Sequence, residues 1–280
     1  DENKCLIHTA FSSNDAWPYD WSDYCAASGY TFVPGDNFEQ ALIDLGYDDT
    51  LNNYVVTDSI SGVTTLNVSN DSISDLTGIE GFTALTSLYC YRNQLTALDV
   101  SANTALTTLW CDKNQLTALD VSANTALTDL RCYSNQLTSL DVSNNTALTS
   151  LYCYRNQLTA LDVSNNTALT TLYCYGSSST STYGVTNQIT ALDVSNNTAL
   201  TSLSCTYNQL TTLDVSNNTA LTSLTCYNNQ LTALDVSNNT ALTLLSCGYQ
   251  PITELDVSNN TALTSLYCHS NELTVLDVSN

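Results

Sequence analysis

Basic residues, proline and methionine are scarce in this 280-residue sequence. Five Lys and Arg residues stand against 27 Asp and Glu residues, which gives a formal net charge of -22, and there are three prolines, two histidines and no methionine. Because phosphate backbones and anionic lipid headgroups attract positive charge, this balance argues against nucleic acid and anionic membrane surfaces as partners. No apolar run approaches the ~20 residues that a membrane-spanning helix needs.

The sequence also lacks a set of chemically different side chains that could converge in an active site. The two histidines, His8 and His269, are far apart in the sequence, and no serine, cysteine or carboxylate stands out from its repeated neighbours as a candidate catalytic group. An enzyme needs a few unlike groups in one pocket, whereas this chain supplies rows of like groups. We therefore expect no enzymatic activity and assign no catalytic residue.

A block of 21 residues recurs from Leu85 to the end of the chain. Aligned from its first leucine, each copy reads LxxLxCxxNxLxxLDVSxNxx. The nine copies open at Leu85, Leu106, Leu127, Leu148, Leu169, Leu200, Leu221, Leu242 and Leu263. A fixed period of this length, with leucines in fixed slots, predicts a solenoid in which each repeat forms one coil.

Each copy contains two segments in which apolar and polar residues alternate. In the first copy, residues 88–91 read Leu, Tyr, Cys, Tyr, and residues 98–101 read Leu, Asp, Val, Ser. A period of two is typical of strands with one buried face. We therefore predict a β-rich solenoid with two short parallel sheets around one core and little helix in the repeats.

The repeat resembles the leucine-rich repeat family, consensus LxxLxLxxNxL, in its nested bacterial 21-residue form, whose second half reads LxxLDLxxN. Ahead of the nine copies, Val63–Ala84 is similar to a 22-residue repeat of the internalin type, which makes about ten coils over residues 63–280. The resemblance implies that the asparagine after the first strand of each coil satisfies backbone groups there. Gln250 takes this slot in one coil and Pro251 follows it, so we expect a distorted turn at that point.

The segment ahead of the repeats has the features of an N-terminal cap. Residues 1–33 contain Cys5 and Cys25, which we expect to form a disulfide, as in proteins of an oxidising extracellular setting. Over residues 34–62 we expect a capping helix and a linker. The predicted helix has Asp36 or Asn37 as N-cap, Phe38, Ala41, Leu42 and Leu45 on one face, and Gly46 as its end.

Residues 33–88 also resemble the opening of secreted leucine-rich repeat proteins of the Bacteroidota. Three triplets of Asp, Ser or Thr, and an apolar residue are similar to an O-glycosylation signal of that phylum, with Thr50, Ser59 and Ser72 as acceptors. The chain opens directly on Asp1, and we interpret it as a mature, processed form.

The last copy stops at LTVLDVSN without a polar terminal cap. Its apolar slots would then face water edge-on, and the burial of each such side chain contributes ~1.5 to 3 kcal/mol, so we expect something to cover them. Further C-terminal residues, a partner protein and another copy of the chain are the three alternatives. Copies that joined head to tail without closing would build a filament.

Two rows of identical residues run along the predicted coils. Nine cysteines from Cys90 to Cys268 face inward at a spacing unlike a zinc or redox pair, and we interpret them as small buried hydrophobic residues. Nine aspartates from Asp99 to Asp277 lie on the outer face, where their mutual repulsion must be relieved. Either water and neighbouring hydroxyls do this, or a hard cation such as Ca²⁺ bridges successive coils. We assign no metal ligands and no cofactor.

The outer face of the first sheet is the least uniform row and the usual ligand face of the family that the repeat resembles. Its first five coils carry the densest group of exposed aromatic residues and four of the five basic residues, while Tyr227 and Tyr267 are exceptions in the later coils. We predict a partner-binding face made of Tyr89, Tyr91, Arg92, Trp110, Lys113, Arg131, Tyr133, Tyr152, Tyr154, Arg155, Tyr173 and Tyr175. Aromatic and arginine side chains supply much of the energy at protein interfaces, although tyrosine also simply suits a strand. An insertion at 176–185 falls where this aromatic half ends.

These features predict a non-enzymatic, secreted or cell-surface bacterial protein, adhesive or structural, that contacts a protein partner or copies of itself. A carbohydrate-binding protein is one alternative, because planar rings also stack on sugars. An ice-binding solenoid is another, suggested by the threonines Thr86, Thr107, Thr128 and Thr149, although ice binding requires a flat and uncharged face.

Overall fold

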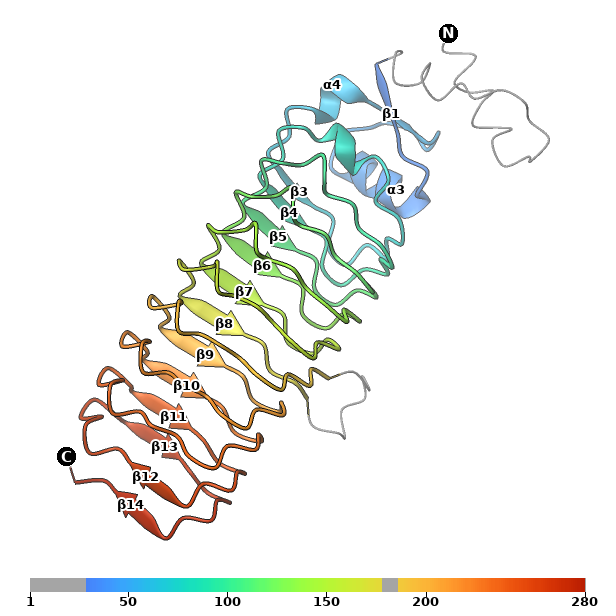
Figure 1. The fold of residues 1–280 in the computed structure, drawn as a ribbon. Helices are drawn as coiled ribbons and strands as arrows, with labels where there is room; N and C mark the ends of the chain where they lie inside the picture. Colours follow the sequence, from blue (N-terminus) through green and yellow to red (C-terminus); the bar gives the residue numbers. More distant parts are fainter. Residues whose placement is uncertain (1–28, 178–185, 280) are drawn as a thin grey trace.

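The structure, a computed structural model, describes residues 29–177 and 186–279. It is an elongated stack of short coils, one coil per repeat, with the helices confined to the N-terminal end (Figure 1). Cys5, Cys25 and most of the insertion at 176–185 lie outside the described residues. The predicted class, a β-rich solenoid with little helix in the repeats, is confirmed.

One side of the solenoid is a parallel ten-stranded sheet, and each coil adds one strand to it. The register pairs the same slot in every coil, as in Leu88 with Leu109 and Leu109 with Leu130. The strands, in order, are β3 (Thr65–Asn67), β4 (Ser87–Tyr89), β5 (Thr108–Trp110), β6 (Asp129–Arg131), β7 (Ser150–Tyr152), β8 (Thr171–Tyr173), β9 (Ser202–Ser204), β10 (Ser223–Thr225), β11 (Leu244–Ser246) and β13 (Ser265–Tyr267).

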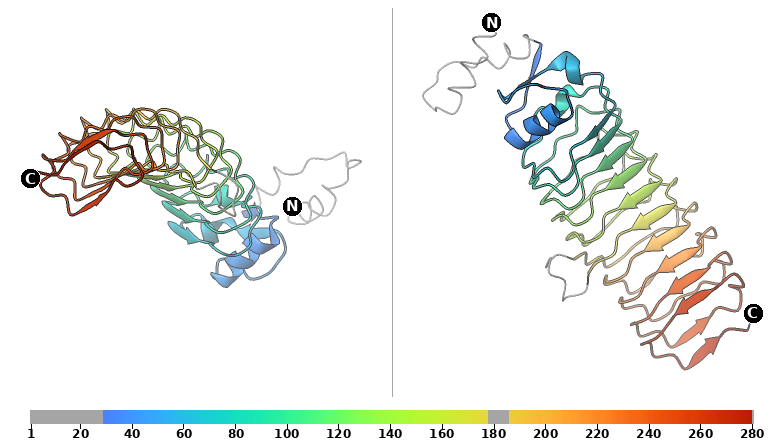
Figure 2. Two further views of the ribbon diagram at one scale, coloured as in Figure 1. Left: turned by 90° about the horizontal axis from the view of Figure 1, so that it is seen from below. Right: turned by 180° about the vertical axis from the view of Figure 1, so that it is seen from behind.

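The second predicted sheet is much smaller than expected. Within the described residues it consists of two parallel strands, β12 (Glu254–Asp256) and β14 (Val275–Asp277). The earlier coils keep the inward-facing valine of this segment, for example Val100 and Val121, without strand pairing. The stack is curved (Figure 2), and in a curved stack the coils are closest on one side and further apart on the other. Such curvature therefore allows a continuous sheet only on the side where the coils are closest together.

The N-terminal end of the stack is covered by a small cap. Strand β1 (Tyr30–Phe32) pairs antiparallel with β2 (Tyr54–Val56), and helices α3 (Asp36–Asp44) and α4 (Thr57–Ile60) lie beside them, while the single-turn helix η1 (Ile79–Gly81) belongs to the first coil. Phe38 and Leu42 of α3 are fully buried in the same core as the repeats, and the ring of Phe38 lies 6.3 Å from that of Phe82.

Two details of the predicted helix were wrong. The N-cap is Gly35 rather than Asp36 or Asn37, because the Asn37 amide Nδ2 donates to the carbonyl oxygen of Ser72 (2.8 Å) and thereby joins the helix to the first coil. Leu45 follows the last helical residue and is 46% exposed, so it does not share the buried face. Gly46 ends the helix as predicted, with a φ of 79° that favours glycine.

A single apolar core runs the length of the solenoid. Each 21-residue coil contributes its leucines, one valine and one cysteine, and nearly all core side chains are fully buried from Leu66 to Leu245. The last coil is more open: Val275, Leu276 and Val278 are each about half exposed.

The turn asparagines bond the coils together as predicted. Asn114 donates from Nδ2 to the carbonyl oxygens of Cys90 and Cys111 (3.0 Å each), and its Oδ1 accepts the N–H of Leu95 at 3.0 Å. Gln250 makes the equivalent bonds, donating to Cys226 (3.0 Å) and accepting the N–H of Leu231 (3.1 Å). The turn beside Gln250 keeps the ordinary conformation, with a φ of 55° at Tyr249, so the expected distortion is absent.

A second row of buried asparagines was not predicted. Asn124 donates from Nδ2 to the carbonyl oxygens of Val100 (3.0 Å) and Asn103 (2.9 Å) in the preceding coil. All eight members of the row are fully buried: Asn103, Asn124, Asn145, Asn166, Asn197, Asn218, Asn239 and Asn260. The asparagine of the recurring SxN pattern was the signal for this row in the sequence.

Candidate partner-binding surface

The strand register places one residue from each of the first five coils in a single column on the outer face of the ten-stranded sheet. Tyr89 is paired with Trp110, Trp110 with Arg131, Arg131 with Tyr152, and Tyr152 with Tyr173. All five side chains are half-buried, because each one leans on its neighbours in the column. The predicted residues are therefore brought together here, and we call this group the aromatic column.

Arg131 lies at the centre of the aromatic column between two rings. Its guanidinium carbon is 3.7 Å from the ring centroid of Trp110 and 4.9 Å from that of Tyr152, both within the range of a cation–π interaction. Tyr89 meets Trp110 edge-on at 4.8 Å, and Tyr152 meets Tyr173 edge-on at 5.1 Å. The column is therefore a packed array rather than five independent side chains.

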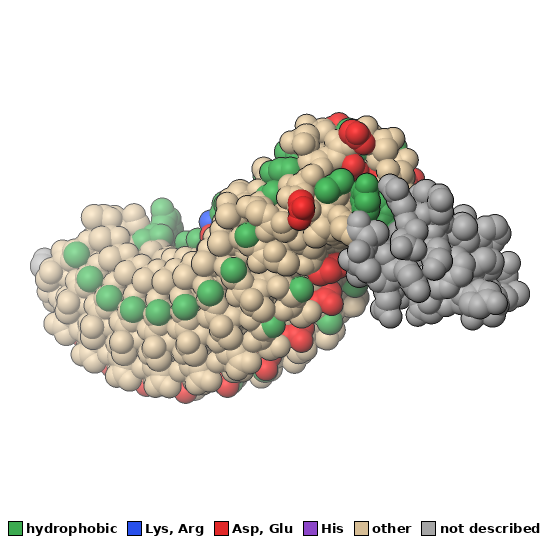
Figure 3. All heavy atoms as spheres, turned by 90° about the horizontal axis from the view of Figure 1, so that it is seen from above, with side chains coloured by type: hydrophobic (Ala, Val, Ile, Leu, Met, Phe, Trp, Pro, Cys, Tyr) green, Lys and Arg blue, Asp and Glu red, His purple; other side chains and the backbone are tan. Residues whose placement is uncertain are grey.

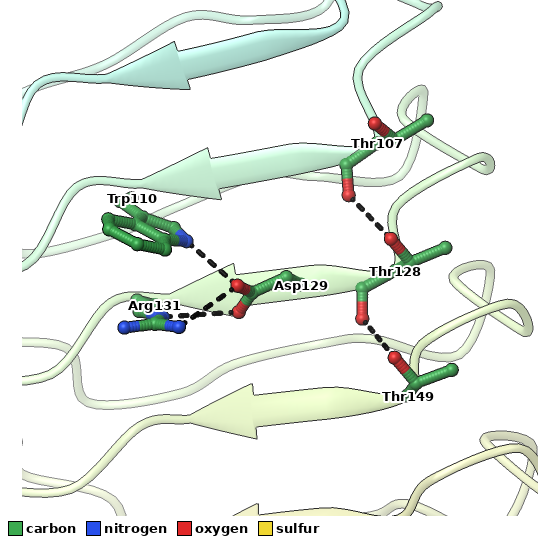
Figure 4. Close-up of polar contacts among 6 residues, drawn as sticks. All are labelled: Thr107, Trp110, Thr128, Asp129, Arg131 and Thr149. Atoms are coloured by element: carbon green, nitrogen blue, oxygen red, sulfur yellow. Dashed lines mark hydrogen bonds and ion pairs between the residues drawn. The ribbon is translucent and has the colours of Figure 1, made fainter. Parts of the chain in front are cut away.

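Asp129 holds the centre of this array in place. Its carboxylate accepts the indole N–H of Trp110 at 2.9 Å and two N–H groups of Arg131 at 3.2 and 3.3 Å (Figure 4). Most other coils have Ser or Thr at the position of Asp129. Thr108 and Ser150, which are paired with Asp129 in the neighbouring strands, are examples. Sequence reasoning missed Asp129, although this departure from the repeat was visible.

A second column lies beside the first, two residues further along each coil. The rings of Tyr133, Tyr154 and Tyr175 are stacked, with centroids 4.3 and 4.1 Å apart and planes 12° from parallel. Burial is the main cause that raises the pKa of all three phenols, and it raises that of Tyr133 to about 12. These tyrosines therefore stay neutral at physiological pH.

Asp112 takes the tyrosine slot of this second column in its own coil and was also missed. Its side chain is only 3% exposed, and desolvation raises the pKa of its carboxyl despite a hydrogen bond from Tyr133 and the nearby charges of Lys113 and Arg131. The carboxyl of Asp112 is therefore almost completely shielded from solvent at the end of the tyrosine stack.

The remaining basic residues occupy one turn slot, in which the backbone is left-handed. Arg92, Lys113 and Arg155 each have a φ of 54°, and Ser134 has the same φ in the coil between the last two. The residues that the structure describes provide no ion-pair partner for any of these three. Arg92 and Lys113 come from adjacent coils and are exposed.

The two columns and the turn slot enclose a shallow hollow of about 280 Å³. Its lining residues are Asn70, Tyr91, Arg92, Trp110, Asp112, Lys113, Arg131 and Tyr133. Three cations and three aromatic rings thus face one space, in a protein whose net charge is strongly negative. Tyr207, Tyr227, Tyr249 and His269 make isolated ring pairs in the later coils, without a basic residue.

Comparison with known proteins points to the internalins. A solved structure described as the functional domain of internalin J from Listeria monocytogenes, including a cysteine ladder, is 43% identical to this chain, with a TM-score of 0.81 over 89% of this chain and 54% of that one. The described part of the chain has the leucine-rich repeat fold. Full-length internalin J of strain F2365 is 44% identical over 75 residues, which are 26% of this chain and 8% of that protein.

Other leucine-rich repeat structures share the fold at lower identity. The internalin InlF of Listeria monocytogenes is 23% identical, with a TM-score of 0.55 over 88% of this chain and 89% of that one. A chain of the LRIM1/APL1C complex is 21% identical, with a TM-score of 0.63 over 80% of this chain and 42% of that one. A family model described as an LVIVD repeat matches residues 224–247, from β10 to β11. This leucine-rich repeat chain spans about half of the internalin J structure and a small part of the full-length protein.

The cysteine row of this leucine-rich repeat solenoid lies inside the core, as predicted. Cys90 to Cys247 are buried and Cys268 is half-buried, and all nine are free thiols. Burial raises the pKa of the buried thiols, and raises that of Cys132 and Cys174 to about 12. Because a buried neutral thiol is a poor nucleophile and a poor ligand, these cysteines act as packing residues.

The aspartate row is exposed and forms a line of acidic side chains along the molecule (Figure 3). Each carboxylate accepts the N–H of the serine two residues later, as in Asp141 and Ser143 at 2.9 Å. Hydrogen bonds from the serine lower the pKa of Asp141, which stabilises the charged form. The neighbouring serine thus stabilises the charged carboxylate by hydrogen bonding. Bridging of successive coils by Ca²⁺ stays an open alternative.

The threonine row that suggested ice binding is engaged within the protein. The hydroxyl of Thr128 donates to the carbonyl oxygen of Thr107, and that of Thr149 to the carbonyl oxygen of Thr128 (3.1 and 3.0 Å; Figure 4). These hydroxyls join successive coils and flank the aromatic column. They do not form a separate flat face.

The three predicted O-glycosylation acceptors, Thr50, Ser59 and Ser72, are exposed around the cap and first coil. Glycosylation at these three residues stays a prediction.

Within residues 29–177 and 186–279, no helix is long and apolar enough to cross a bilayer. In the same residues, no three of the His, Cys, Asp and Glu side chains are grouped as metal ligands would be.

Proposed function

We propose that the chain is a non-enzymatic protein-binding solenoid of the bacterial surface or exterior, and that it contacts its partner with the aromatic column and the hollow beside it. The observation that carries this proposal is the packed unit of Trp110, Arg131 and Asp129. Trp, Tyr and Arg are the residues that most often dominate protein interfaces. The similarity to internalin J, and the occurrence of this fold in the LRIM1/APL1C complex, support a binding role for a protein partner.

Rigidity is the physical reason to place the partner here. The ring of Trp110 is held by Asp129 and by Arg131, so its side chain loses little conformational freedom on binding. A surface ordered in advance avoids about 0.5–1.5 kcal/mol per side chain of the cost of association. The outer face of the later coils carries mainly serine and threonine and lacks an equivalent unit.

The alternative of carbohydrate binding is less well supported by the geometry. A sugar that stacks on an aromatic ring needs an open ring face. Arg131 lies 3.7 Å over the ring of Trp110, and the stacked faces of Tyr133, Tyr154 and Tyr175 cover one another. Protein contact uses ring edges and flanking groups as well, and so fits this surface better.

The test is selection from a displayed library of random peptides on the immobilised wild-type protein alone, after which the affinity of the enriched peptides for the variant Trp110→Ala/Tyr152→Ala is measured. Enriched peptides should bind the double variant at least thirtyfold more weakly, because truncation of a hot-spot residue costs about 2 kcal/mol or more. The matched control is Tyr227→Ala/Tyr267→Ala, which removes two tyrosines of the same sheet outside the column and should leave binding within twofold.

Two outcomes would overturn the proposal. One is that enriched peptides bind the wild type and the Trp110→Ala/Tyr152→Ala variant equally. The other is that a glycan array gives binding dependent on Trp110 while the peptide library gives none. Head-to-tail assembly of copies is examined separately by electron microscopy of concentrated protein, in which a uniformly monomeric population would exclude a filament.

A further inference from the structure

Three cations converge on the hollow, and the carboxylate residue in its lining, Asp112, is almost fully buried. Arg92 and Lys113 protrude from adjacent coils at the same left-handed turn slot, and both are exposed and without an ion-pair partner in the described part of the chain. Asp112 is buried and desolvated. Asp129 already neutralises Arg131. Neither Arg92 nor Lys113 is held in an ion pair within the described residues, so both can bind a ligand.

Aromatic rings form the rest of the lining. Tyr91, Trp110 and Tyr133 surround the basic groups, and Lys113 lies 5.7 Å from the ring centroid of Tyr133. An anionic group bound here would have apolar surface on both sides. That combination suits an acidic side chain flanked by apolar or aromatic neighbours.

We infer that the hollow lined by Arg92, Lys113, Trp110 and Tyr133 is a subsite for a carboxylate side chain, Glu or Asp, of a protein partner. The inference rests on the proposed function and names the chemistry that the surface selects. A guanidinium binds a carboxylate by two parallel N–H···O bonds, and Arg92 is free to do so. The ammonium of Lys113 adds a second donor from the neighbouring coil.

The charge of the whole chain limits the ligand further. With a net charge of -22, the protein repels extended polyanions at long range. Screening reduces that repulsion to the nearest ~8–10 Å at physiological salt, so that a single acidic segment can still approach two local cations. The subsite therefore fits one or two carboxylates in a largely neutral segment, and does not fit nucleic acid or a polysulfated chain.

Titration with a defined probe tests the subsite. The probe is the acetylated and amidated hexapeptide Gly-Tyr-Glu-Glu-Tyr-Gly, and its comparison is the same peptide with both Glu replaced by Gln. The fluorescence of Trp110 in the hollow reports binding, and the variant Trp110→Phe supplies the background from Trp17 and Trp21. The Glu peptide should bind at least tenfold more tightly than the Gln peptide, and this preference should shrink as salt is raised.

The variants use residues that the repeat already tolerates. Ser134 and Ser270 occupy the same slot with φ values of 54° and 57°, so Arg92→Ser and Lys113→Ser preserve the turn. The double variant should lose at least tenfold in affinity for the Glu peptide and little for the Gln peptide. Arg155→Ser, in the same slot outside the hollow, removes the same charge and should change affinity less than twofold.

Each other outcome contradicts the inference in its own way. Equal binding of the Glu and Gln peptides would overturn carboxylate recognition and leave the aromatic column as a binding surface. Equal losses for Arg155→Ser and the double variant would reduce the effect to general electrostatics. Tighter binding of a glucuronic-acid oligosaccharide would assign the subsite to acidic sugars. Binding of none of these probes would overturn the subsite, while the peptide selection decides the proposed function independently.

Discussion

Asp112 and Asp129 show how single departures from the repeat create local chemistry. The repeat offers Tyr and Ser or Thr at their slots, and the two carboxylates replace them in adjacent coils. Asp129 is partly exposed and binds Arg131 and Trp110, whereas Asp112 is buried and held beside Tyr133. One carboxylate thus orders the aromatic column and the other lies beneath the hollow.

Asp112→Asn should stabilise the protein at neutral pH. The pKa of Asp112 is raised in the folded state, so folding favours the protonated form, and this contribution to stability is present at low pH and lost as pH rises through the raised pKa. Each pKa unit of elevation corresponds to about 1.4 kcal/mol. Thermal unfolding of both proteins from pH 3 to pH 7 should give a difference that grows with pH, and a variant less stable at pH 7 would contradict this reasoning.

Asn156→Ala should be among the most destabilising single changes in the repeats. Asn156 is fully buried, donates to the carbonyl oxygens of Cys132 and Cys153, and accepts the N–H of Leu137. Its loss leaves several buried backbone groups unsatisfied at ~1–3 kcal/mol each, so the free energy of unfolding should fall by about 3 kcal/mol. Denaturant titration measures this. Asn165→Ala in the same coil removes one exposed bond of 3.3 Å and should cost under ~0.5 kcal/mol; equal effects would refute the assignment.

At the scale of the structural elements, rows of side chains add hydrogen bonds to those that the backbone makes between the coils. The strands of the ten-stranded sheet have three residues each, and asparagine, threonine and aspartate side chains supply further bonds in and between the coils. Several substitutions in one row should therefore affect the stability of this molecule together.

The aspartate row should make the protein sensitive to acid. In eight of its nine positions serine lowers the pKa of the carboxyl, so this stability is present above the ordinary pKa and is lost as pH falls through the lowered values. The variant Asp141→Asn/Asp162→Asn/Asp193→Asn keeps an oxygen acceptor without a titrating charge. Its unfolding temperature should drop less than that of wild type between pH 5 and pH 2, and a parallel drop would count against the row.

The sequence allowed most of this element-level structure to be predicted, because a period of two within a period of 21 leaves one arrangement for Leu88, Cys90 and Tyr89. It could not show that the second sheet is nearly absent, since curvature depends on how whole coils pack. It also did not reveal the Arg131 stack on Trp110, because that contact joins residues 21 apart through side-chain conformations. The helix start at Gly35 was missed because Asn37 bonds to Ser72, a partner far away in the sequence.

For the molecule as a whole, a stack of coils implies that stability is roughly a sum over neighbours. Deletion of Leu221–Ala241 removes one complete coil and brings β9 next to β11 with Leu203 and Leu245 in register. The shortened protein should keep its circular dichroism spectrum and unfold cooperatively at a somewhat lower temperature. Deletion of residues 221–231 alone breaks the register and should abolish the folded spectrum; if both deletions behave alike, the coils are not independent units.

The central claim for the whole molecule is that a partner binds the aromatic column and the hollow beside it. The most direct measurement is hydroxyl-radical footprinting of the protein alone and bound to a peptide selected on it. We predict lower oxidation of Tyr89, Trp110, Tyr152 and Tyr173 in the complex, and unchanged oxidation of Tyr227, Tyr249 and Tyr267. Protection confined to those later tyrosines, with Trp110 as reactive as in the free protein, would contradict it.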